Sequence, residues 1–251
     1  MIEQWANVEA SLRRLESEAL NAVNLKTVRL LAPVQRPGKI MAIGLNYADH
    51  IAESDMAVPE RQIWFSKSVT AVNGPYDPID LPAVPIPHVD YEAELVAVIG
   101  KGGRRIERDR APQAIFGYCV GNDVTERAWQ HATPQWLLGK SFDTHAPFGP
   151  WITTADECRE PHDHNIRCWV NGEIRQNSNT KHLVFDVGAQ IEHLSKAMTL
   201  EAGDIIYTGT PGGVGAAMKP MVFLKHDDMV RVEIEGLGFI EAVCKSGLTN
   251  V

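Results

Sequence analysis

Asp90-Tyr91-Glu92-Ala93-Glu94 runs directly into the apolar residues Leu95-Val96-Ala97-Val98-Ile99, and this stretch decides the fold. The apolar half is rich in β-branched residues and ends at Gly100, which is typical of a buried β-strand. Residues two apart on a strand face the same side. Glu92 and Glu94 are therefore expected to direct two carboxylates at one point, at the end of a hydrophobic strand.

Two ionised carboxylates held this close repel each other unless a proton or a cation lies between them. A second apolar strand, expected over residues 114–120, is followed by Gly121-Asn122-Asp123. Asp123 can supply a third carboxylate, and a set of oxygen ligands suits a divalent cation. The alternative left open by the spacing is a pair of glutamates that face solvent on a strand.

Length and charge limit what the chain can do. It has 251 residues, which suits one sizeable domain, and a formal net charge of -8 without a block of Lys and Arg. Binding to nucleic acid or to an anionic membrane is therefore not expected. An anionic substrate would have to be attracted locally, by a metal ion or a few placed cations, because the overall field opposes it.

The apolar runs and the cysteines favour a soluble protein of a reducing compartment. No apolar run reaches the roughly 20 residues of a membrane span. The four cysteines form no Cys-x-x-Cys pair and no signal peptide is recognised, so we expect free thiols and a cytoplasmic location. A zinc site made by Cys158, His162, His164 and Cys168 matches no common template, and a polar connecting loop is favoured there.

The N-terminal part shows no candidate chemistry. An amphipathic helix is predicted over residues 3–22, where apolar residues recur at spacings of three and four. A short strand is expected over 28–34. Residues 1–37 are interpreted as an N-terminal helix with a lead-in strand, and residues 38–251 as the main domain.

A further candidate lies in a short helix predicted after Gly44-Leu45-Asn46-Tyr47, with Asn46 as its N-cap. His50 and Glu53 stand three residues apart, so they share one face of that helix and can meet. An imidazole that is oriented by a carboxylate is a competent general base for water. An exposed ion pair near a helix start is the plainer alternative.

The remaining pattern contains more strands than helices. Asn171-Gly172 between two strand-like runs predicts a β-hairpin with a type I′ turn. A helix is expected over 185–198, a glycine-rich loop over 208–215 and a second hairpin over 229–243. Since the regular alternation of strands and helices is absent, we predict an α+β protein dominated by mixed or antiparallel sheet.

These motifs, in this order, resemble the fumarylacetoacetate hydrolase family from about Val28 to the C-terminus, in its small acylpyruvase-like branch. The resemblance rests on five collinear stretches: Gly44-Leu45-Asn46-Tyr47-Ala48-Asp49-His50, Tyr91-Glu92-Ala93-Glu94-Leu95, Gly121-Asn122-Asp123-Val124-Thr125, Gly139-Lys140-Ser141-Phe142-Asp143 and Thr208-Gly209-Thr210-Pro211. It implies the family's fold, a mixed β-sheet roll or barrel with peripheral helices, and a homodimer.

The resemblance also assigns roles. It implies that Glu92, Glu94 and Asp123 bind Mg²⁺ or Mn²⁺, which as hard cations prefer oxygen ligands. It implies His50 and Glu53 as the pair that activates water, with Lys140 beside the metal. The substrate-binding residues that it implies are Tyr47, Arg127, Gln130 and Thr210.

The implied activity is hydrolysis of a C–C bond in a short 2,4-dioxo acid, an acylpyruvate, which releases pyruvate and a carboxylic acid. Oxaloacetate decarboxylation and isomerisation of unsaturated dioxo acids use the same metal–enolate chemistry and are alternatives. A non-catalytic, metal-stabilised binding protein is the alternative of another class. The variable end of this small anionic substrate is expected near residues 55–62 and Trp136.

Overall fold

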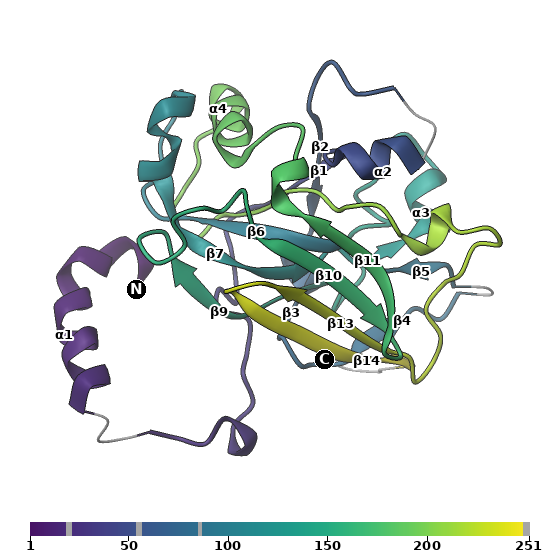
Figure 1. Ribbon diagram of the computed structural model, residues 1–251, viewed down its shortest axis with the longest axis horizontal. Helices are drawn as coiled ribbons and strands as arrows, with labels where there is room; N and C mark the ends of the chain where they lie inside the picture. The colour runs from purple at the N-terminus through teal and green to yellow at the C-terminus, as the bar shows by residue number, and fades with distance from the viewer. Residues whose placement is uncertain (19–21, 54–56, 85–86, 248–251) are drawn as a thin grey trace.

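Two mixed β-sheets face each other in the computed structural model, with the helices at the periphery (Figure 1). The structure describes residues 1–18, 22–53, 57–84 and 87–247. The helices are α1 (Trp5–Glu18), α2 (Ala48–Glu53), α3 (Arg127–His131) and α4 (Val187–Ala197). This curled arrangement of sheets is the α+β fold that the sequence predicts.

The larger sheet has seven strands in the order β2-β1-β12-β6-β7-β9-β3. Its strands are β1 (Ile40–Gly44), β2 (Ile63–Lys67), β3 (Val72–Asn73), β6 (Ala93–Ile99), β7 (Ile115–Asn122), β9 (Ala146–Thr154) and β12 (Ile205–Tyr207). β1 pairs with β12 in parallel, whereas β6 runs antiparallel to both of its neighbours, β12 and β7.

The smaller sheet has five strands in the order β11-β10-β13-β14-β4. Its strands are β4 (Ile79–Leu81), β10 (Asn165–Val170), β11 (Glu173–Asn179), β13 (Met229–Ile234) and β14 (Gly238–Ser246). Both predicted hairpins are confirmed, and the Asn171-Gly172 turn has positive φ at both residues, as type I′ requires. A two-stranded ladder joins β5 (Val89–Asp90) to β8 (Thr125–Glu126).

β6 is buried along its whole length because both of its faces are covered. Leu95, Ala97 and Ile99 point into the core between the two sheets. Val96 and Val98 point to the other face, into a second core. This burial on both sides explains the uninterrupted apolar run of the strand, and it fixes the carboxylates at its start relative to the body of the protein.

α1 extends away from the two sheets (Figure 1). The Trp5 ring packs edge-on against Phe116 with the ring centroids 5.1 Å apart, and the Arg13 guanidinium lies 3.2 Å from the Asp156 carboxylate. The predicted helix is confirmed over residues 5–18, and residues 19–21 of the prediction lie outside the described residues.

Two local predictions for the N-terminal half were wrong. Residues 28–34 form no strand: Pro33 removes an N–H donor, and Arg29 pairs with the Asp77 side chain at 2.8 Å. Asn46 does not cap α2. Its side-chain NH₂ instead donates to the Phe185 and Thr208 carbonyls, at 3.0 and 2.7 Å, and its oxygen accepts from the Phe185 N–H at 2.8 Å.

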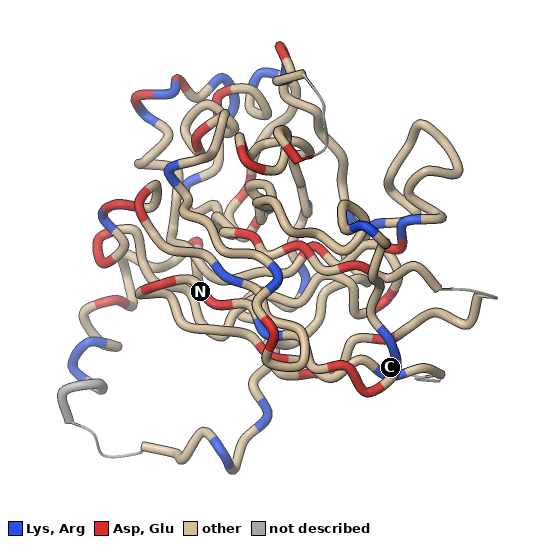
Figure 2. The backbone as a smooth tube through the Cα atoms, turned by 45° about the vertical axis from the view of Figure 1, so that its right-hand side comes forward, with Lys and Arg blue, Asp and Glu red and all other residues tan. Residues whose placement is uncertain are grey.

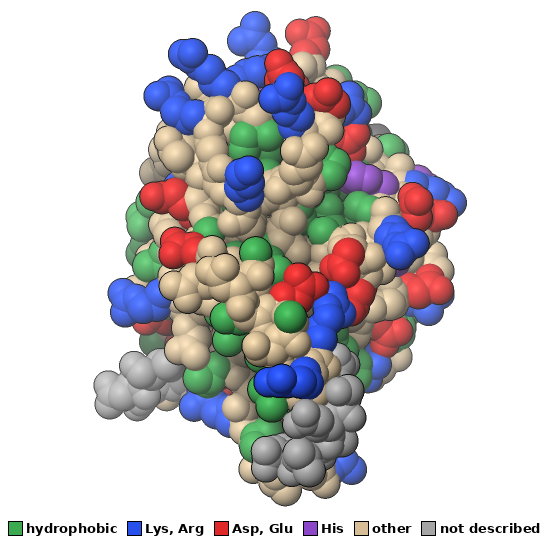
Figure 3. All heavy atoms as spheres, turned by 90° about the vertical axis from the view of Figure 1, so that its left-hand side faces the viewer, with side chains coloured by type: hydrophobic (Ala, Val, Ile, Leu, Met, Phe, Trp, Pro, Cys, Tyr) green, Lys and Arg blue, Asp and Glu red, His purple; other side chains and the backbone are tan. Residues whose placement is uncertain are grey.

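Basic and acidic residues are interspersed along the chain (Figure 2). Figure 3 shows the same mixture on one face, where Lys and Arg side chains at the top lie beside Asp and Glu. One basic-rich segment, residues 101–110, is itself interrupted by Glu107 and Asp109. Within the described residues, no helix has the length and apolar character that crossing a membrane requires.

The Asn46 contacts predict a stability effect. Asn46→Ala removes three buried hydrogen bonds that join the start of α2 to segments about 140–160 residues away, each bond contributing roughly 1 kcal/mol. We expect the free energy of unfolding to fall by about 2–3 kcal/mol in urea titrations followed by circular dichroism. The control Asn7→Ala, at an exposed asparagine on α1, should change it by less than about 0.5 kcal/mol. Equal losses in both variants would contradict the assignment.

Candidate active site

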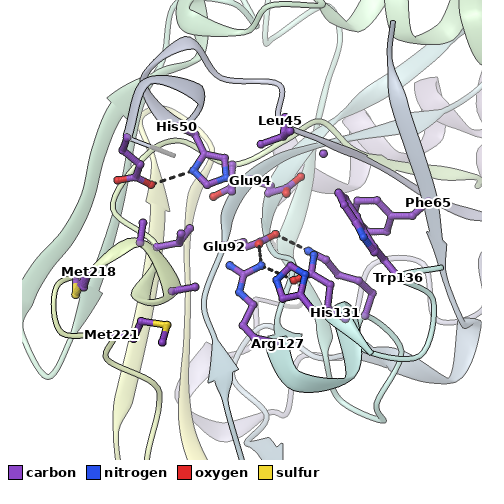
Figure 4. A pocket seen from close by; sticks show the side chains of 18 of the residues that line it. Leu45, His50, Phe65, Glu92, Glu94, Arg127, His131, Trp136, Met218 and Met221 are labelled. Carbon is purple, nitrogen blue, oxygen red and sulfur yellow. Dashed lines mark hydrogen bonds and ion pairs between the residues drawn. The ribbon is translucent and has the colours of Figure 1, made fainter. Parts of the chain in front are cut away.

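A cavity of about 620 Å³ opens at the end of the sheets where α2 and α3 lie (Figures 1 and 4). Its lining includes most of the residues that the sequence singles out: His50, Glu53, Glu92, Glu94, Arg127, Gln130, Lys140 and Thr210. Segments that are far apart in the sequence therefore converge on one site, as the collinear motifs predict.

The three predicted metal ligands lie together. Glu92 precedes β6, Glu94 is on β6 and Asp123 follows β7, and the antiparallel pairing Ala93↔Asn122 brings these strand ends side by side. One oxygen from each carboxylate lies within 4.8 Å of the others, and all three residues are buried. The expectation that Glu92 and Glu94 serve one point is confirmed, and the solvent-facing alternative is wrong.

Two buried lysines and a largely buried arginine surround these carboxylates. Lys140 Nζ lies 2.6 Å from an oxygen of Glu92 and 2.6 Å from one of Asp123. An Arg127 Nη1 contacts Glu92 at 2.7 Å. Lys67 Nζ lies 2.5 Å from the other Asp123 oxygen. The sequence interpretation missed Lys67, although a lysine that closes the apolar strand 63–67 is a usable signal of a buried ion pair.

The cluster shifts the pKa values of the two glutamates in opposite directions. Burial raises the pKa of Glu94 well above its usual range, and the nearby Asp123 and Glu92 charges raise it further. Burial also acts upward on Glu92, but Lys140 and Arg127 outweigh it and lower the pKa of that carboxyl. One oxygen of Glu94 accepts a hydrogen bond from the Gly209 N–H at 2.7 Å. Its other oxygen has no hydrogen bond to the described residues.

This donor set fits a hard divalent cation. Three carboxylates converge, and one oxygen of Glu94 has no hydrogen bond to the described residues. The surroundings disfavour the ionised form of the Glu94 carboxyl unless extra positive charge is present. A cation placed among the three oxygens would supply that charge. Glu92, Glu94 and Asp123 are therefore the residues that could hold Mg²⁺ or Mn²⁺, whereas a soft metal would need sulfur ligands.

His50 and Glu53 form the predicted pair on α2. His50 Nδ1 lies 2.9 Å from one Glu53 oxygen, and the other Glu53 oxygen accepts the Gly213 N–H at 2.8 Å. Nε2 of His50 has no hydrogen-bond partner among the described residues. Figure 4 shows the His50 ring beside the Glu94 carboxylate. The imidazole is thus oriented, with one nitrogen free for proton transfer.

Arg127 is held by several partners. Its Nε and Nη2 donate to one oxygen of Asp90, at 2.9 and 2.8 Å, and its Nη1 donates to Gln130 Oε1 at 2.9 Å as well as pairing with Glu92. Asp90 also accepts the backbone N–H groups of Gly215 and Ala216, at 2.8 and 3.0 Å. A guanidinium has five N–H donors, so these contacts leave one Nη2 hydrogen for a substrate oxygen.

Two predicted substrate contacts differ in outcome. Thr210 lines the cavity, and its hydroxyl oxygen accepts from Gln176 Nε2 at 2.8 Å, which leaves the hydroxyl hydrogen free to donate. Tyr47 is not among the residues that line the cavity. Its backbone bridges Leu183, and its side chain is fully buried in the core, where the hydroxyl has no hydrogen-bond partner among the described residues. A direct contact between Tyr47 and a substrate has no support in this geometry.

The outer wall differs from the sequence expectation. Trp136 lines the cavity as predicted, but no residue of 57–62 does, and residues 54–56 lie outside the described residues. The segment 214–221 takes that place. The candidate zinc residues do not converge within the described chain: Cys158 Sγ contacts His164 Nε2 at 3.4 Å, while His162 accepts the Val187 N–H. All four cysteines are buried and free.

Removing a carboxylate from the cluster should weaken metal binding. Glu94→Gln replaces a charged ligand by a neutral amide, so we expect Mn²⁺ affinity to fall at least tenfold in calorimetric titrations. Glu173→Gln, at an exposed glutamate on β11, is the matched control and should bind Mn²⁺ like the unmodified protein. Indistinguishable affinities in the two variants would contradict the ligand assignment.

Metal binding should also release a proton. Because burial and the nearby carboxylates raise the pKa of Glu94, we expect the cation to displace a proton from this carboxyl. Mn²⁺ affinity is therefore expected to increase with pH. Titrations at neutral pH in buffers of different ionisation enthalpy should show about one proton released in the unmodified protein and fewer in Glu94→Gln. No proton release in the unmodified protein would refute this account of Glu94.

Comparisons with known proteins agree with this geometry. Residues 39–244 match the family model described as fumarylacetoacetate (FAA) hydrolase C-terminal. The chain is 48% identical over 215 residues to oxaloacetate tautomerase fahd2, mitochondrial, of Xenopus laevis, covering 85% of this chain and 67% of that protein. It is 46% identical to oxaloacetate tautomerase FAHD2A, mitochondrial, of Bos taurus, covering 96% and 78%.

Solved structures give the same picture. Maleylpyruvate hydrolase from Sphingobium sp. SYK-6 matches with a TM-score of 0.85 at 35% identity, over 98% of this chain and 85% of that one. The same enzyme has been solved with manganese (II) ion and pyruvate. A 2-hydroxyhepta-2,4-diene-1,7-dioate isomerase from Mycobacterium marinum matches with a TM-score of 0.79 at 36% identity, over 92% and 82%. The chain is an enzyme of the fumarylacetoacetate hydrolase family.

Proposed function

We propose that this enzyme binds a divalent metal ion and moves a proton at the carbon next to the keto group of a 2-oxo acid, and that its reaction is the interconversion of the enol and keto forms of oxaloacetate. The observation that carries the proposal is the His50–Glu53 pair, whose imidazole stands beside the Glu94 carboxylate of the acidic cluster. Several relatives that are 43–48% identical to the chain are named oxaloacetate tautomerases.

Glu92, Glu94 and Asp123 would hold the ion, Mg²⁺ or Mn²⁺. When bound, the ion supplies positive charge that polarises the 2-oxo group and stabilises an enolate. The manganese and pyruvate of the Sphingobium maleylpyruvate hydrolase structure support this choice of ion and of chelating group.

The remaining groups of the site bind the substrate by its carboxylate. Lys140 uses two of its three donors on Glu92 and Asp123 and keeps one. The free hydrogen of Arg127 and the hydroxyl of Thr210 are the other donors available. These groups fix the 2-oxo end, and the cations supply the local attraction that a chain of net charge -8 otherwise lacks.

His50 performs the proton transfer. Starting from the keto form, Nε2 takes a proton from C3, and the electron pair of that C–H bond forms the double bond of the enolate. His50 then gives this proton to the 2-oxygen, which produces the enol and restores the neutral imidazole. Glu53 holds Nδ1–H and stabilises the imidazolium between the two transfers. The reverse sequence gives the keto form, and no co-reactant is consumed.

Acylpyruvate hydrolysis, the activity favoured by the sequence resemblance, is the second candidate. His50 would take a proton from water instead of from C3; the water would attack the C4 carbonyl, and the C3–C4 bond would break to leave pyruvate enolate. Two observations favour it: the likeness to maleylpyruvate hydrolase, and a cavity of about 620 Å³ that gives water room beside the substrate.

Compartment and assembly stay predictions. The relatives of Xenopus laevis and Bos taurus carry the word mitochondrial in their names, so a cytoplasmic location is not supported by them. A homodimer is part of the proposal because the family resemblance implies it.

His50→Ala should lower the rate of oxaloacetate tautomerisation by about 10²–10⁴-fold, since it removes a general acid–base group. The decay of the enol is followed by its ultraviolet absorbance with saturating Mn²⁺. His193→Ala, at an exposed histidine on α4, is the matched control and should keep the full rate. Full activity in His50→Ala would sink the proposed role, and unchanged turnover after chelation would sink the metal requirement.

A further inference from the structure

The outer half of the cavity is mostly apolar. The acidic cluster and its cations gather at the inner end, and hydrophobic side chains make up most of the remaining lining: Ile43, Leu45, Phe65, Trp136, Met218 and Met221. His131 and Lys219 also line the cavity, and Lys219 is exposed to solvent. A volume of about 620 Å³ is in the range of pockets that enclose drug-sized ligands. Oxaloacetate is a compact four-carbon acid, so its binding by the 2-oxo end would leave the outer half unfilled.

One wall is a fixed aromatic surface. The Trp136 ring packs closely against Gly44, where an added Cβ would stand 2.6 Å from Trp136 Cζ3. The Phe65 ring packs against it, with the centroids 5.4 Å apart. The Lys140 N–H donates to the Trp136 carbonyl at 3.1 Å, so one turn of chain delivers both the cation of the inner end and the aromatic ring of the outer wall.

The opposite wall is adaptable. Met218 and Met221 lie across the cavity from Phe65 and Trp136, with the glutamates between the two sides (Figure 4). Their segment is tied at one end by the bonds of Gly215 to Asp90, and at the other by the Val222 N–H, which donates to the Gly215 carbonyl at 3.1 Å. Thioether side chains are flexible and polarizable, which suits contact with apolar groups of varied shape.

We infer that the enzyme accepts 2-oxo acids with an apolar tail of several carbons, alkyl or aryl, and that this tail lies between Trp136 and the two methionines. The inference deepens the proposed function and rests on the 2-oxo end being bound at the acidic cluster. A tail gains free energy from burial against these walls, whereas a second carboxylate placed there loses hydration. The tail is therefore the main source of discrimination between substrates.

The test uses binding, so it does not depend on turnover. The Mn²⁺-loaded protein is titrated calorimetrically with pyruvate, 2-oxopentanoate and 2-oxoheptanoate, which share one chelating end and differ in tail length. Burying one CH₂ group is equivalent to about a fourfold change in affinity at most. We expect the dissociation constant to fall by about two- to fourfold for each added methylene.

Two variants locate the tail. Trp136→Ala should flatten the dependence on length while pyruvate still binds, and the matched control Trp151→Ala, at a half-exposed tryptophan outside the cavity lining, should keep it. Met221→Lys changes the opposite wall at a residue 63% exposed, where folding tolerates the substitution, and it should also reduce the dependence.

Each outcome decides the inference. The inference is supported if affinity rises with tail length in the unmodified protein and this dependence is reduced in both variants. The same result supports the tail site even if oxaloacetate is not tautomerised, and then only the proposed reaction fails. A flat series in the unmodified protein overturns the inference even when tautomerisation is intact. A series that stays graded in both variants overturns the placement of the tail, and the absence of binding by all three acids overturns both proposals.

Discussion

The site depends on a buried balance of charge. Four carboxylates and three cations are packed together at the strand ends with almost no contact with water: Glu92, Glu94, Asp123 and Asp90 against Lys67, Lys140 and Arg127. With every group ionised the cluster carries one net negative charge, and the upward shift in the pKa of Glu94 shows which carboxyl resists that state. A proton on Glu94 neutralises the cluster without metal. A divalent cation in its place makes the cluster net positive, which is what an anionic 2-oxo acid requires.

The two sheets hold that cluster rigid. β6 is covered on both faces, so Glu92 and Glu94 are fixed at the end of a strand that cannot shift its register without exposing apolar residues. β7 fixes Asp123 through the same ladder. His50, the proposed general base, is on the short helix α2, which Asn46 joins to the 185 and 208 segments. Rigid ligands and a separately anchored base are what preorganised proton transfer needs.

Much of this could be predicted from the sequence, because the signals are local. The two-residue spacing of Glu92 and Glu94 at the start of β6, the apolar run of β7 and the three-residue spacing of His50 and Glu53 each fix a geometry within a few residues. The structure brings these segments together at one cavity. What could not be predicted depends on distant partners. Asn46 has the composition of a helix cap but binds chain 139 and 162 residues away. Residues 28–34 have strand propensity but form no strand, and Tyr47, whose backbone bridges Leu183, is buried in the core. The counter-ion Lys67 is visible in the sequence, but its partner Asp123 is 56 residues away.

The central claim is that three carboxylates form one divalent-metal site at the ends of β6 and β7. It is tested most directly by anomalous diffraction from crystals of the protein grown with Mn²⁺ and pyruvate. We expect a single strong manganese peak within coordination distance of Glu92, Glu94 and Asp123, with pyruvate oxygens completing its shell. A manganese peak elsewhere, or a cluster in which Lys140 and Arg127 keep the carboxylates paired and exclude the ion at saturating Mn²⁺, would contradict it.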